Sequence, residues 1–242
     1  MNKTYNITSS DAILITDIQK DFLPGGALPV PSGDEIIPVL NEYAKYFENA
    51  KAHVFASRDW HPSDHCSFKQ LGGPWPPHCV QNTEGAKLSP NLELPKGTVI
   101  ISKATDPKHE SYSVFDRTNF QDKLRKCSVT RLFVGGLATD YCVVNTVLDA
   151  LKLGFKTVVL MDATLGINVD PGDVDRAVDN MVKMGAEQAT TADFPDAVDA
   201  LPVGEDAADA MGEKPSERAD DKRKARMRPR GQSKRIPTER KK

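Results

Sequence analysis

The sequence contains no apolar run long enough to cross a bilayer, which takes about 20 consecutive residues in a helix. Its first eleven residues are polar and lack the apolar stretch that a secretory signal peptide needs. These absences exclude an integral membrane protein. We therefore expect a soluble protein of the cytoplasm that has no membrane partner.

Cysteine is scarce, and none is expected to form a disulfide. The chain has four cysteines in 242 residues: Cys66, Cys79, Cys127 and Cys142. Disulfide scaffolds are typical of small secreted domains, so reduced thiols are the better expectation in a chain of this length without a secretory signal. Each thiol can therefore be considered as a nucleophile, a metal ligand or a packing residue. Cys127 follows a charged run and is interpreted as structural.

The chain also lacks a large overall charge, but its two parts differ. Residues 202–242 hold 13 Lys and Arg against 8 Asp and Glu, whereas residues 1–201 hold 19 against 26. Because residues 202–242 have few large apolar side chains, we predict one globular domain over residues 1–201 and a disordered, charged, basic tail over residues 202–242. The basic runs leave nucleic-acid binding open, although interleaved acidic residues and the absence of aromatics favour a solvated tail.

Apolar, β-branched runs alternate with amphipathic segments along residues 12–191. The runs predict strands at residues 12–16, 53–57, 98–103, 131–137, 156–162 and 186–191. The three- and four-residue spacing of apolar side chains predicts helices at residues 34–49, 141–153 and 173–184, the second of them capped by Thr139 and Asp140. This alternation indicates an α/β fold, an open and mostly parallel sheet with helices on both faces. Residues 58–95, rich in Pro, Gly and His, are expected to form a long functional loop.

Chemically capable side chains follow four of the predicted strands. Asp17, Asp59, Lys103 and Cys142 each come at or just after the end of a strand. Ligands of open α/β sheets bind outside the carboxyl ends of the strands, so these residues are expected to meet at one edge. Cys142 lies in the first turn of its helix, where free N–H groups and the helix dipole favour a thiolate and could receive an oxyanion. Asp17 could move the thiol proton, and Lys103 could stabilise negative charge.

A second cluster has the composition of a metal site. Asp59, His61, His65 and His78 supply one carboxylate and three imidazoles, a set that suits zinc first, with iron or manganese as alternatives. Cys66 and Cys79 each follow one of these histidines, so a closed structural zinc site is the competing interpretation. Such a site would leave Asp59 without a role, and we therefore favour the carboxylate and the three histidines.

At these residues the sequence resembles the nicotinamidase (pyrazinamidase) family, within the isochorismatase-like cysteine hydrolases. The resemblance covers about residues 11–194 and depends on five segments: Asp17-Ile18-Gln19-Lys20-Asp21-Phe22, Pro24-Gly25-Gly26-Ala27-Leu28, Arg58-Asp59-Trp60-His61-Pro62, Trp75-Pro76-Pro77-His78-Cys79-Val80 and Gly136-Leu137-Ala138-Thr139-Asp140-Tyr141-Cys142-Val143. Together these motifs are highly specific, although no single one of them is.

The resemblance assigns roles to the residues of both clusters. It implies a catalytic triad of Asp17, Lys103 and Cys142 and one divalent metal bound by Asp59, His61, His65 and His78. The backbone N–H groups of Ala138 and Cys142 would form the oxyanion hole, after a cis peptide bond between Leu137 and Ala138. Phe22, Trp75 and Tyr112 would line the pocket for the substrate ring. Val114 stands where relatives often have Gly, which predicts a reshaped lid beside Tyr112.

The family implies hydrolysis of nicotinamide, and of pyrazinamide, to the acid and ammonia through a cysteine thioester, as a step of NAD salvage. An alternative is an amidohydrolase of the same superfamily that acts on a carbamoyl or ureido compound, but it would not need the metal cluster. An isochorismatase proper would lack the nucleophile Cys142. A different class, an enzyme-like body whose basic tail binds nucleic acid, depends on residues 202–242. The sequence leaves a homo-oligomer open.

Overall fold

The computed structural model describes residues 4–195. The tail that the sequence predicts for residues 202–242 lies outside the described residues. Within residues 4–195, none of the helices combines the length and the apolar character needed to cross a membrane.

The strands of the described chain form one parallel sheet. It has six strands in the order β3-β2-β1-β4-β5-β6, and every neighbouring pair is parallel. The bounds are β1 (Asp11–Thr16), β2 (His53–Asp59), β3 (Val99–Lys103), β4 (Arg131–Leu137), β5 (Lys156–Leu165) and β6 (Glu187–Ala189). The α/β class and all six predicted strands are confirmed, with shifts of a few residues at their ends.

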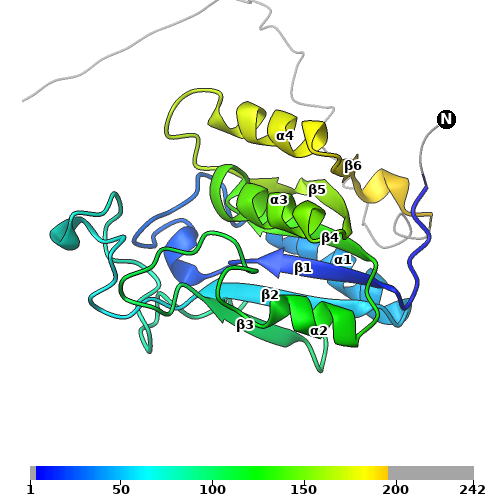
Figure 1. The fold of residues 1–242 in the computed structure, drawn as a ribbon, viewed down its shortest axis with the longest axis horizontal. Coiled ribbons are helices and arrows are strands. Elements are labelled where there is room, and N and C mark those ends of the chain that lie inside the picture. Colours follow the sequence, from blue (N-terminus) through cyan, green and yellow to red (C-terminus); the bar gives the residue numbers. More distant parts are fainter. Residues whose placement is uncertain (1–3, 196–242) are drawn as a thin grey trace, which may run out of the picture. The chain divides into compact units, whose positions relative to one another are not determined.

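Helices cover both faces of this sheet (Figure 1). Helix α1 (Ile37–Asn49) lies on one face, and α2 (Phe120–Lys126), α3 (Val144–Lys152) and α4 (Asp173–Lys183) contribute to the core of the other. Helix α1 starts three residues later than predicted, with a proline in its first turn, where a missing N–H group does no harm. The sequence did not predict α2, because its seven residues are too few to show a periodic apolar face.

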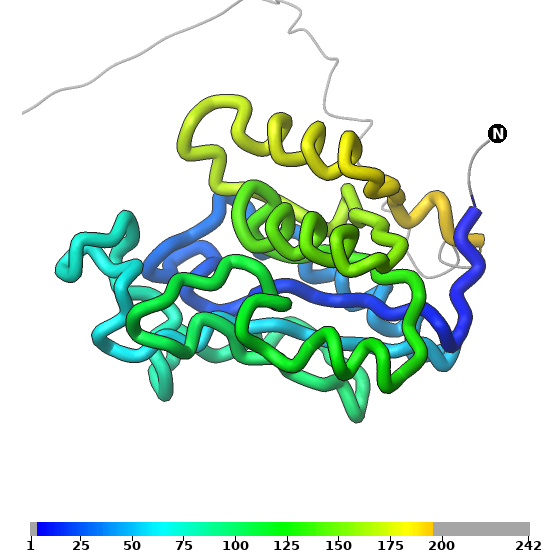
Figure 2. The backbone as a smooth tube through the Cα atoms, in the orientation of Figure 1, coloured from blue at the N-terminus to red at the C-terminus, as the bar shows by residue number. Residues whose placement is uncertain are grey.

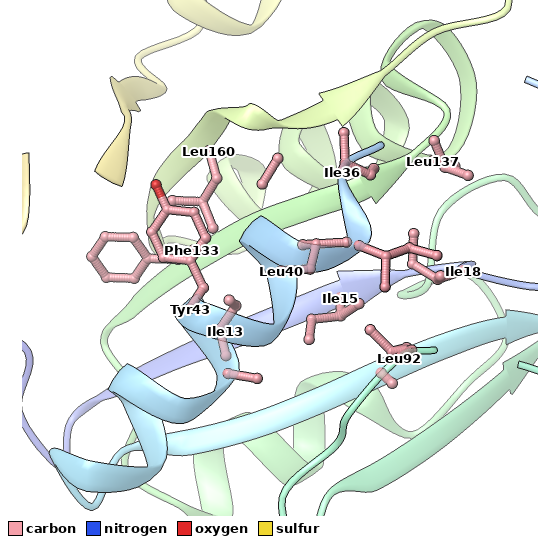
Figure 3. Packing of buried hydrophobic residues seen from close by; sticks show 14 of the residues in the cluster. Ile13, Ile15, Ile18, Ile36, Leu40, Tyr43, Leu92, Phe133, Leu137 and Leu160 are labelled. Atoms are coloured by element: carbon pink, nitrogen blue, oxygen red, sulfur yellow. The ribbon is translucent and has the colours of Figure 1, made fainter. Parts of the chain in front are cut away.

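The central strand shows how alternation builds both cores. Ile13 and Ile15 point to the face covered by α1, where they pack in one cluster with Leu40 and Tyr43 (Figure 3). The intervening residues of β1, Ala12 and Leu14, belong to the second cluster on the opposite face. All residues of β1 are buried, which is why the strand reads as a continuous apolar run rather than as an alternating one.

An aromatic group closes the first core at the amino end of the strands. Phe194 is fully buried and packs against Tyr5, Tyr43, Tyr46 and Phe133, with ring centroids 5.2 to 5.8 Å away. The segment that follows β6 is therefore held to the body of the protein by a large buried side chain.

The connections place the functional loops at one edge. The strand order changes direction between β1 and β4, and α1 and α3 leave these strands on opposite faces. A crevice at the carboxyl ends of the strands is expected at such a switch point. The segments that follow β2 and β3 lie side by side at this end of the sheet (Figure 2). The segment after β2 is irregular, as predicted, with a short 3-10 turn at Lys69–Leu71 and isolated bridges that join His61 to Val80 and Phe68 to Trp75.

The start of α3 differs from the prediction. A π-helical turn (Thr139–Val143) precedes α3, and no side chain caps it. Of the two expected caps, Thr139 shares a 2.8 Å hydrogen bond with the hydroxyl of Thr164. Asp140 accepts hydrogen bonds from the backbone N–H groups of Ile167 and Asn168, at 3.0 and 2.7 Å. The capping prediction is wrong because the carboxylate has partners in the loop after β5, a contact that is distant in sequence.

Candidate active site

Asp17 is turned into the site by the end of β1. The chain leaves the strand at Asp17 in a left-handed conformation, with φ of 52°. The side chain is fully buried, and its Oδ1 accepts a hydrogen bond of 2.7 Å from the hydroxyl of Ser57 at the end of β2. Its Oδ2 lies 3.1 Å from Nζ of Lys103. The carboxylate is thus fixed by one hydroxyl and one ammonium.

Lys103, the last residue of β3, is the centre of the cluster. It is 1% exposed, and its Nζ lies 2.5 Å from Oδ1 of Asp59 and 3.2 Å from Sγ of Cys142. Burial disfavours the charged amine, but the carboxylates of Asp17 and Asp59 raise the pKa of Lys103 well above its ordinary value. Lys103 is therefore an ammonium that contacts a thiol and two carboxylates.

Cys142 lies in the π-helical turn that follows β4. The turn comes directly after a cis peptide bond between Leu137 and Ala138, as predicted from the resemblance. Sγ of Cys142 and a carboxylate oxygen of Asp17 lie within 4.8 Å of each other. Asp17, Lys103 and Cys142, which are far apart in the sequence, are therefore brought together at the carboxyl ends of β1, β3 and β4.

The electrostatics of the thiol differ from the expectation drawn from its place at a helix start. Burial raises the pKa of the Cys142 thiol well above its usual range, with Lys103 opposing and Asp17 and Asp59 adding to the rise. Burial also raises the pKa of Asp17, against the charge of Lys103. The sulfur consequently rests as a thiol, and Asp17 is a stronger base than an ordinary aspartate.

Three of the predicted metal ligands converge beside this cluster. Ligand atoms of Asp59, His61 and His78 all lie within 4.8 Å of one another, and all three residues are buried. Nδ1 of His61 contacts the carbonyl of His78, and Nδ1 of His78 contacts the carbonyl of Pro76. In the part of the chain that the structure describes, Nε2 of His61 is buried without a hydrogen-bond partner.

These contacts fit a bound cation. Metal-binding histidines hold one ring nitrogen on a carbonyl and present the other to the ion. Burial lowers the pKa of His61 to about 4, so its ring is neutral at pH 7. Burial opposes ionisation of Asp59, but Lys103 and His61 lower its pKa. A carboxylate beside two imidazoles, one ring nitrogen of which is buried and unpartnered within residues 4–195, is a set of side chains that could hold a divalent metal.

His65 lies next to this group but faces another way. Its ring stacks on that of His61 with centroids 4.3 Å apart, while its Nδ1 contacts the Ser67 hydroxyl and its Nε2 lies 3.1 Å from the carbonyl of His109. Its ligand atom falls within 4.8 Å of those of His61 and Glu110, a second group that shares His61 with the first. Among residues 4–195, neither Cys66 nor Cys79 belongs to a group of potential metal ligands, which disfavours the closed thiolate site.

A small cavity opens onto the thiol and the metal group. Cys142, Ala138, Asp59 and His78 contribute to its wall. The remaining wall is apolar and aromatic, and is made by Phe22, Leu28, Trp75, Tyr112, Tyr141 and Ile167. The three aromatic residues expected to line a pocket therefore do line one, beside a potential nucleophile.

Two aromatic contacts fix the shape of that wall. Nε1 of Trp75 donates a 3.0 Å hydrogen bond to the hydroxyl of Tyr112, and the rings of both residues contact Tyr141, with centroids 5.1 and 5.5 Å away. Val114 does not line the cavity; it is buried in the core shared with α2 and α3. Trp75, Tyr112 and Tyr141 together form an aromatic wall suited to a flat, ring-containing molecule.

Four wall or support residues were missed by the sequence analysis. One of them, Leu28, is the last residue of the second matched segment. Tyr141 is the neighbour of Cys142, and its place in the matched motif could have identified it. Ser57 is the last residue of the strand predicted at residues 53–57, so the strand-end rule that selected Asp59 could have selected it too. Ile167 carries no local signal, because Asp140, 27 residues earlier, holds its backbone in place.

The chain is similar to known proteins over most of its length. The isochorismatase domain model matches residues 11–193. A nicotinamidase of Escherichia coli (strain K12) is 41% identical over 204 residues, which cover 76% of this chain and 96% of that protein. The crystal structure of a pyrazinamidase of Pyrococcus horikoshii in complex with zinc shows 49% identity and a TM-score of 0.72, covering 75% of this chain and 99% of that one. PnC1 from L. infantum in complex with nicotinate shows 34% identity and a TM-score of 0.73, covering 79% and 98%.

The parallel sheet and the buried site at its carboxyl edge define a hydrolase of the isochorismatase-like class. The nicotinamidase and pyrazinamidase matches also identify the family within that class. The chain belongs to the nicotinamidase/pyrazinamidase family.

Proposed function

We propose that the chain hydrolyses nicotinamide to nicotinic acid and ammonia, and that it accepts pyrazinamide as well. The observation that carries the proposal is the ammonium of Lys103, which contacts both Cys142 at 3.2 Å and Asp17 at 3.1 Å, while Cys142 itself lines the aromatic cavity. The two nicotinamidase and pyrazinamidase relatives described above support this substrate class. The product would enter NAD salvage.

Asp17 and Cys142 perform the first half of the reaction. The carboxylate of Asp17 takes the thiol proton as the sulfur attacks the amide carbon, and an S–C bond forms. Lys103 stabilises the anionic cluster during this transfer. The backbone N–H groups of Ala138 and Cys142 are the proposed donors to the oxyanion, and losing one such donor typically costs about 3 kcal/mol.

The second half releases the products in turn. Asp17 returns its proton to the amide nitrogen as the C–N bond breaks, so that ammonia leaves and a thioester remains. Water then adds to the thioester carbon and passes a proton to Asp17. The C–S bond breaks, the sulfur recovers its proton, and nicotinic acid is released. No proton or electron is left unassigned, and no redox partner is needed.

Asp59, His61 and His78 would hold the metal, with His65 as the fourth proposed ligand. When bound, a divalent ion supplies a Lewis acid for the ring nitrogen of the substrate and for water. Zinc is the proposed ion, because imidazole and carboxylate ligands suit it and because the pyrazinamidase of Pyrococcus horikoshii was solved in complex with zinc. Iron and manganese remain the alternatives that metal analysis would identify.

The test is ammonia release from a panel of amides by metal-analysed protein. The panel contains nicotinamide, pyrazinamide, benzamide and one ureido compound. Nicotinamide and pyrazinamide should be hydrolysed best, and benzamide, which lacks the ring nitrogen, should be poor. Preference for the ureido compound would replace the proposal with the related amidohydrolase.

We also propose which part of the chain carries the activity. Residues 1–201 would carry the activity, since the matched domain ends at residue 193, and residues 202–242 would be a dispensable charged tail. A chain ending at residue 201 should retain its kcat/KM. Comparing nucleic-acid binding by the full chain and by this shorter chain at two salt concentrations tests whether residues 202–242 bind nucleic acid.

The four free cysteines support placement in the reducing cytoplasm, which cell fractionation would check.

A further inference from the structure

The pairing between β1 and β2 continues beyond the point where β1 ends. The register of the two strands runs to the pair Ile15 and Ala56, and the N–H group of Asp17 still donates to the carbonyl of Ser57 at 3.2 Å. The chain then turns away at Asp17. Alternate residues of β2 face β1, so the next backbone groups left without a strand partner on this side are those of Asp59.

The side chain of Gln19 fills that place. Its Oε1 accepts a 2.7 Å hydrogen bond from the N–H group of Asp59, and its Nε2 donates a 2.8 Å hydrogen bond to the carbonyl of the same residue. Nε2 also donates to the carbonyl of Ala86 at 2.9 Å. Gln19 is fully buried. Its amide therefore stands in for a peptide group of the missing strand and joins the turn after β1, the end of β2 and the loop at residue 86.

We propose that Gln19 is a positioning residue for the metal ligand Asp59. An amide that only satisfied buried polar groups could use any neighbouring carbonyl. Gln19 instead holds both backbone groups of one residue, which fixes the direction in which the Asp59 side chain leaves the strand. That side chain must reach the histidines while it accepts from Lys103, so a small rotation of its backbone would misplace it. The inference rests on the metal site of the proposed function.

Asn41 offers a matched control. Its side-chain amide also donates one hydrogen bond to a loop and accepts one from it, but the two bonds go to different residues: the carbonyl of Asn91 at 2.9 Å and the N–H group of Glu93 at 2.8 Å. Asn41 lies on α1 and lines no part of the cavity. Replacing it by leucine removes an amide clamp of the same kind while the site stays intact.

The experiment compares Gln19→Met with Asn41→Leu in the full chain. Zinc affinity is measured by competition with a chelator, and kcat and KM for nicotinamide are measured over a range of zinc concentrations. Gln19→Met should weaken zinc binding by about 10- to 100-fold, the usual effect of losing a residue that orients a ligand. Its loss of kcat/KM should largely disappear at saturating zinc. Asn41→Leu should bind zinc as the wild type does.

Two outcomes would overturn the inference. One is unchanged zinc affinity in Gln19→Met, and the other is a loss of activity that saturating zinc does not restore. If Gln19→Met does not fold, Gln19→Asn, which keeps the amide but shortens its reach, is measured by the same criteria. A wild-type protein that binds no divalent metal would instead refute the proposed function, so the two failures are distinguishable.

Discussion

Lys103 donates to Asp59 at 2.5 Å, and this contact joins the proposed catalytic group to the proposed metal group. Neither residue could serve its own cluster without affecting the other, because the ammonium that contacts Cys142 also balances the charge of a metal ligand. If the lysine were removed, Asp17 and Asp59 would lose the ammonium that both of them contact.

Replacing Lys103 with methionine should therefore damage both stability and catalysis. The change leaves two carboxylates buried without their ammonium, and breaking such a buried pair costs about 3–5 kcal/mol. Urea denaturation should show this loss in the free energy of unfolding, and ammonia release should fall strongly. Lys152→Met, which removes a surface pair with Asp149, should change neither. An unchanged unfolding free energy in Lys103→Met would show that the buried charges are not coupled as described.

Replacing Cys142 with alanine should abolish turnover and leave substrate binding intact. Removing a nucleophile that acts with its base as a unit lowers kcat by at least about 1000-fold. Calorimetric titration with nicotinamide should still detect binding, because the aromatic wall is unchanged. Cys127→Ala is the matched control, since that thiol lies outside the site. Near wild-type ammonia release by Cys142→Ala would rule out this cysteine as the nucleophile.

The protein should lose stability as the pH rises above about 9. The folded state holds the pKa of Cys142 well above its ordinary value, mainly through burial. In that range the unfolded chain releases a proton that the folded protein keeps, so the free energy of unfolding falls, by up to about 1.4 kcal/mol per pH unit for one group. Denaturation at pH 8 and pH 10 should show a smaller fall for Cys142→Ala than for the wild type. Equal falls would indicate that this thiol ionises normally when folded.

The histidines should differ in their effect on metal content. Within residues 4–195, Nε2 of His61 is buried and has no hydrogen-bond partner, so His61→Ala should lose the metal and raise the KM for nicotinamide. His65→Ala should lose less, because both ring nitrogens of His65 already contact protein atoms. Metal analysis of the purified variants checks both statements. Active wild-type protein without a bound divalent ion would reject the whole ligand set.

Asp140 should control the affinity for substrate without touching it. Its carboxylate holds the backbone of Ile167, which lines the cavity, and Asp140→Ala frees that loop. Losing about 1–2 kcal/mol of binding would raise KM roughly tenfold while kcat changes little. Steady-state kinetics check this split, with Asp149→Ala as the control. A loss confined to kcat would instead place Asp140 in the chemical step.

The sequence predicts the elements of this fold better than their junctions. The buried runs identify all six strands, because β-branched and apolar residues mark strands covered on both faces. The strand-end rule also brings Asp17, Lys103 and Cys142 to one edge. The role of Asp140 could not be predicted, since a carboxylate at a helix start normally caps it, and a loop 27 residues away competes here for the same oxygens. The hydrogen bonds of Gln19 could not be predicted either, because their partners, Asp59 and Ala86, are 40 and 67 residues away in the sequence.

The pKa of the Cys142 thiol and the orientation of the His65 ring could not be predicted from the sequence either. A thiol in the first turn of a helix suggests a lowered pKa, but the depth of burial reverses that expectation for Cys142. Burial depth depends on how α3, the aromatic wall and the strand ends pack together, which no local pattern encodes. Likewise, the orientation of the His65 ring is set by Ser67 and by the distant carbonyl of His109.

The buried ring of Phe194 has a practical consequence for anyone handling this protein. It anchors the chain after β6 against Phe133 in the first half of β4, whereas Cys142 lies in the turn that follows the carboxyl end of the same strand. A fluorophore, affinity tag or solid support joined directly at Pro195 would therefore start beside the Phe194 anchor, and Pro195 is not among the residues that line the cavity. Immobilised enzyme prepared in this way should turn over amide as freely as enzyme in solution.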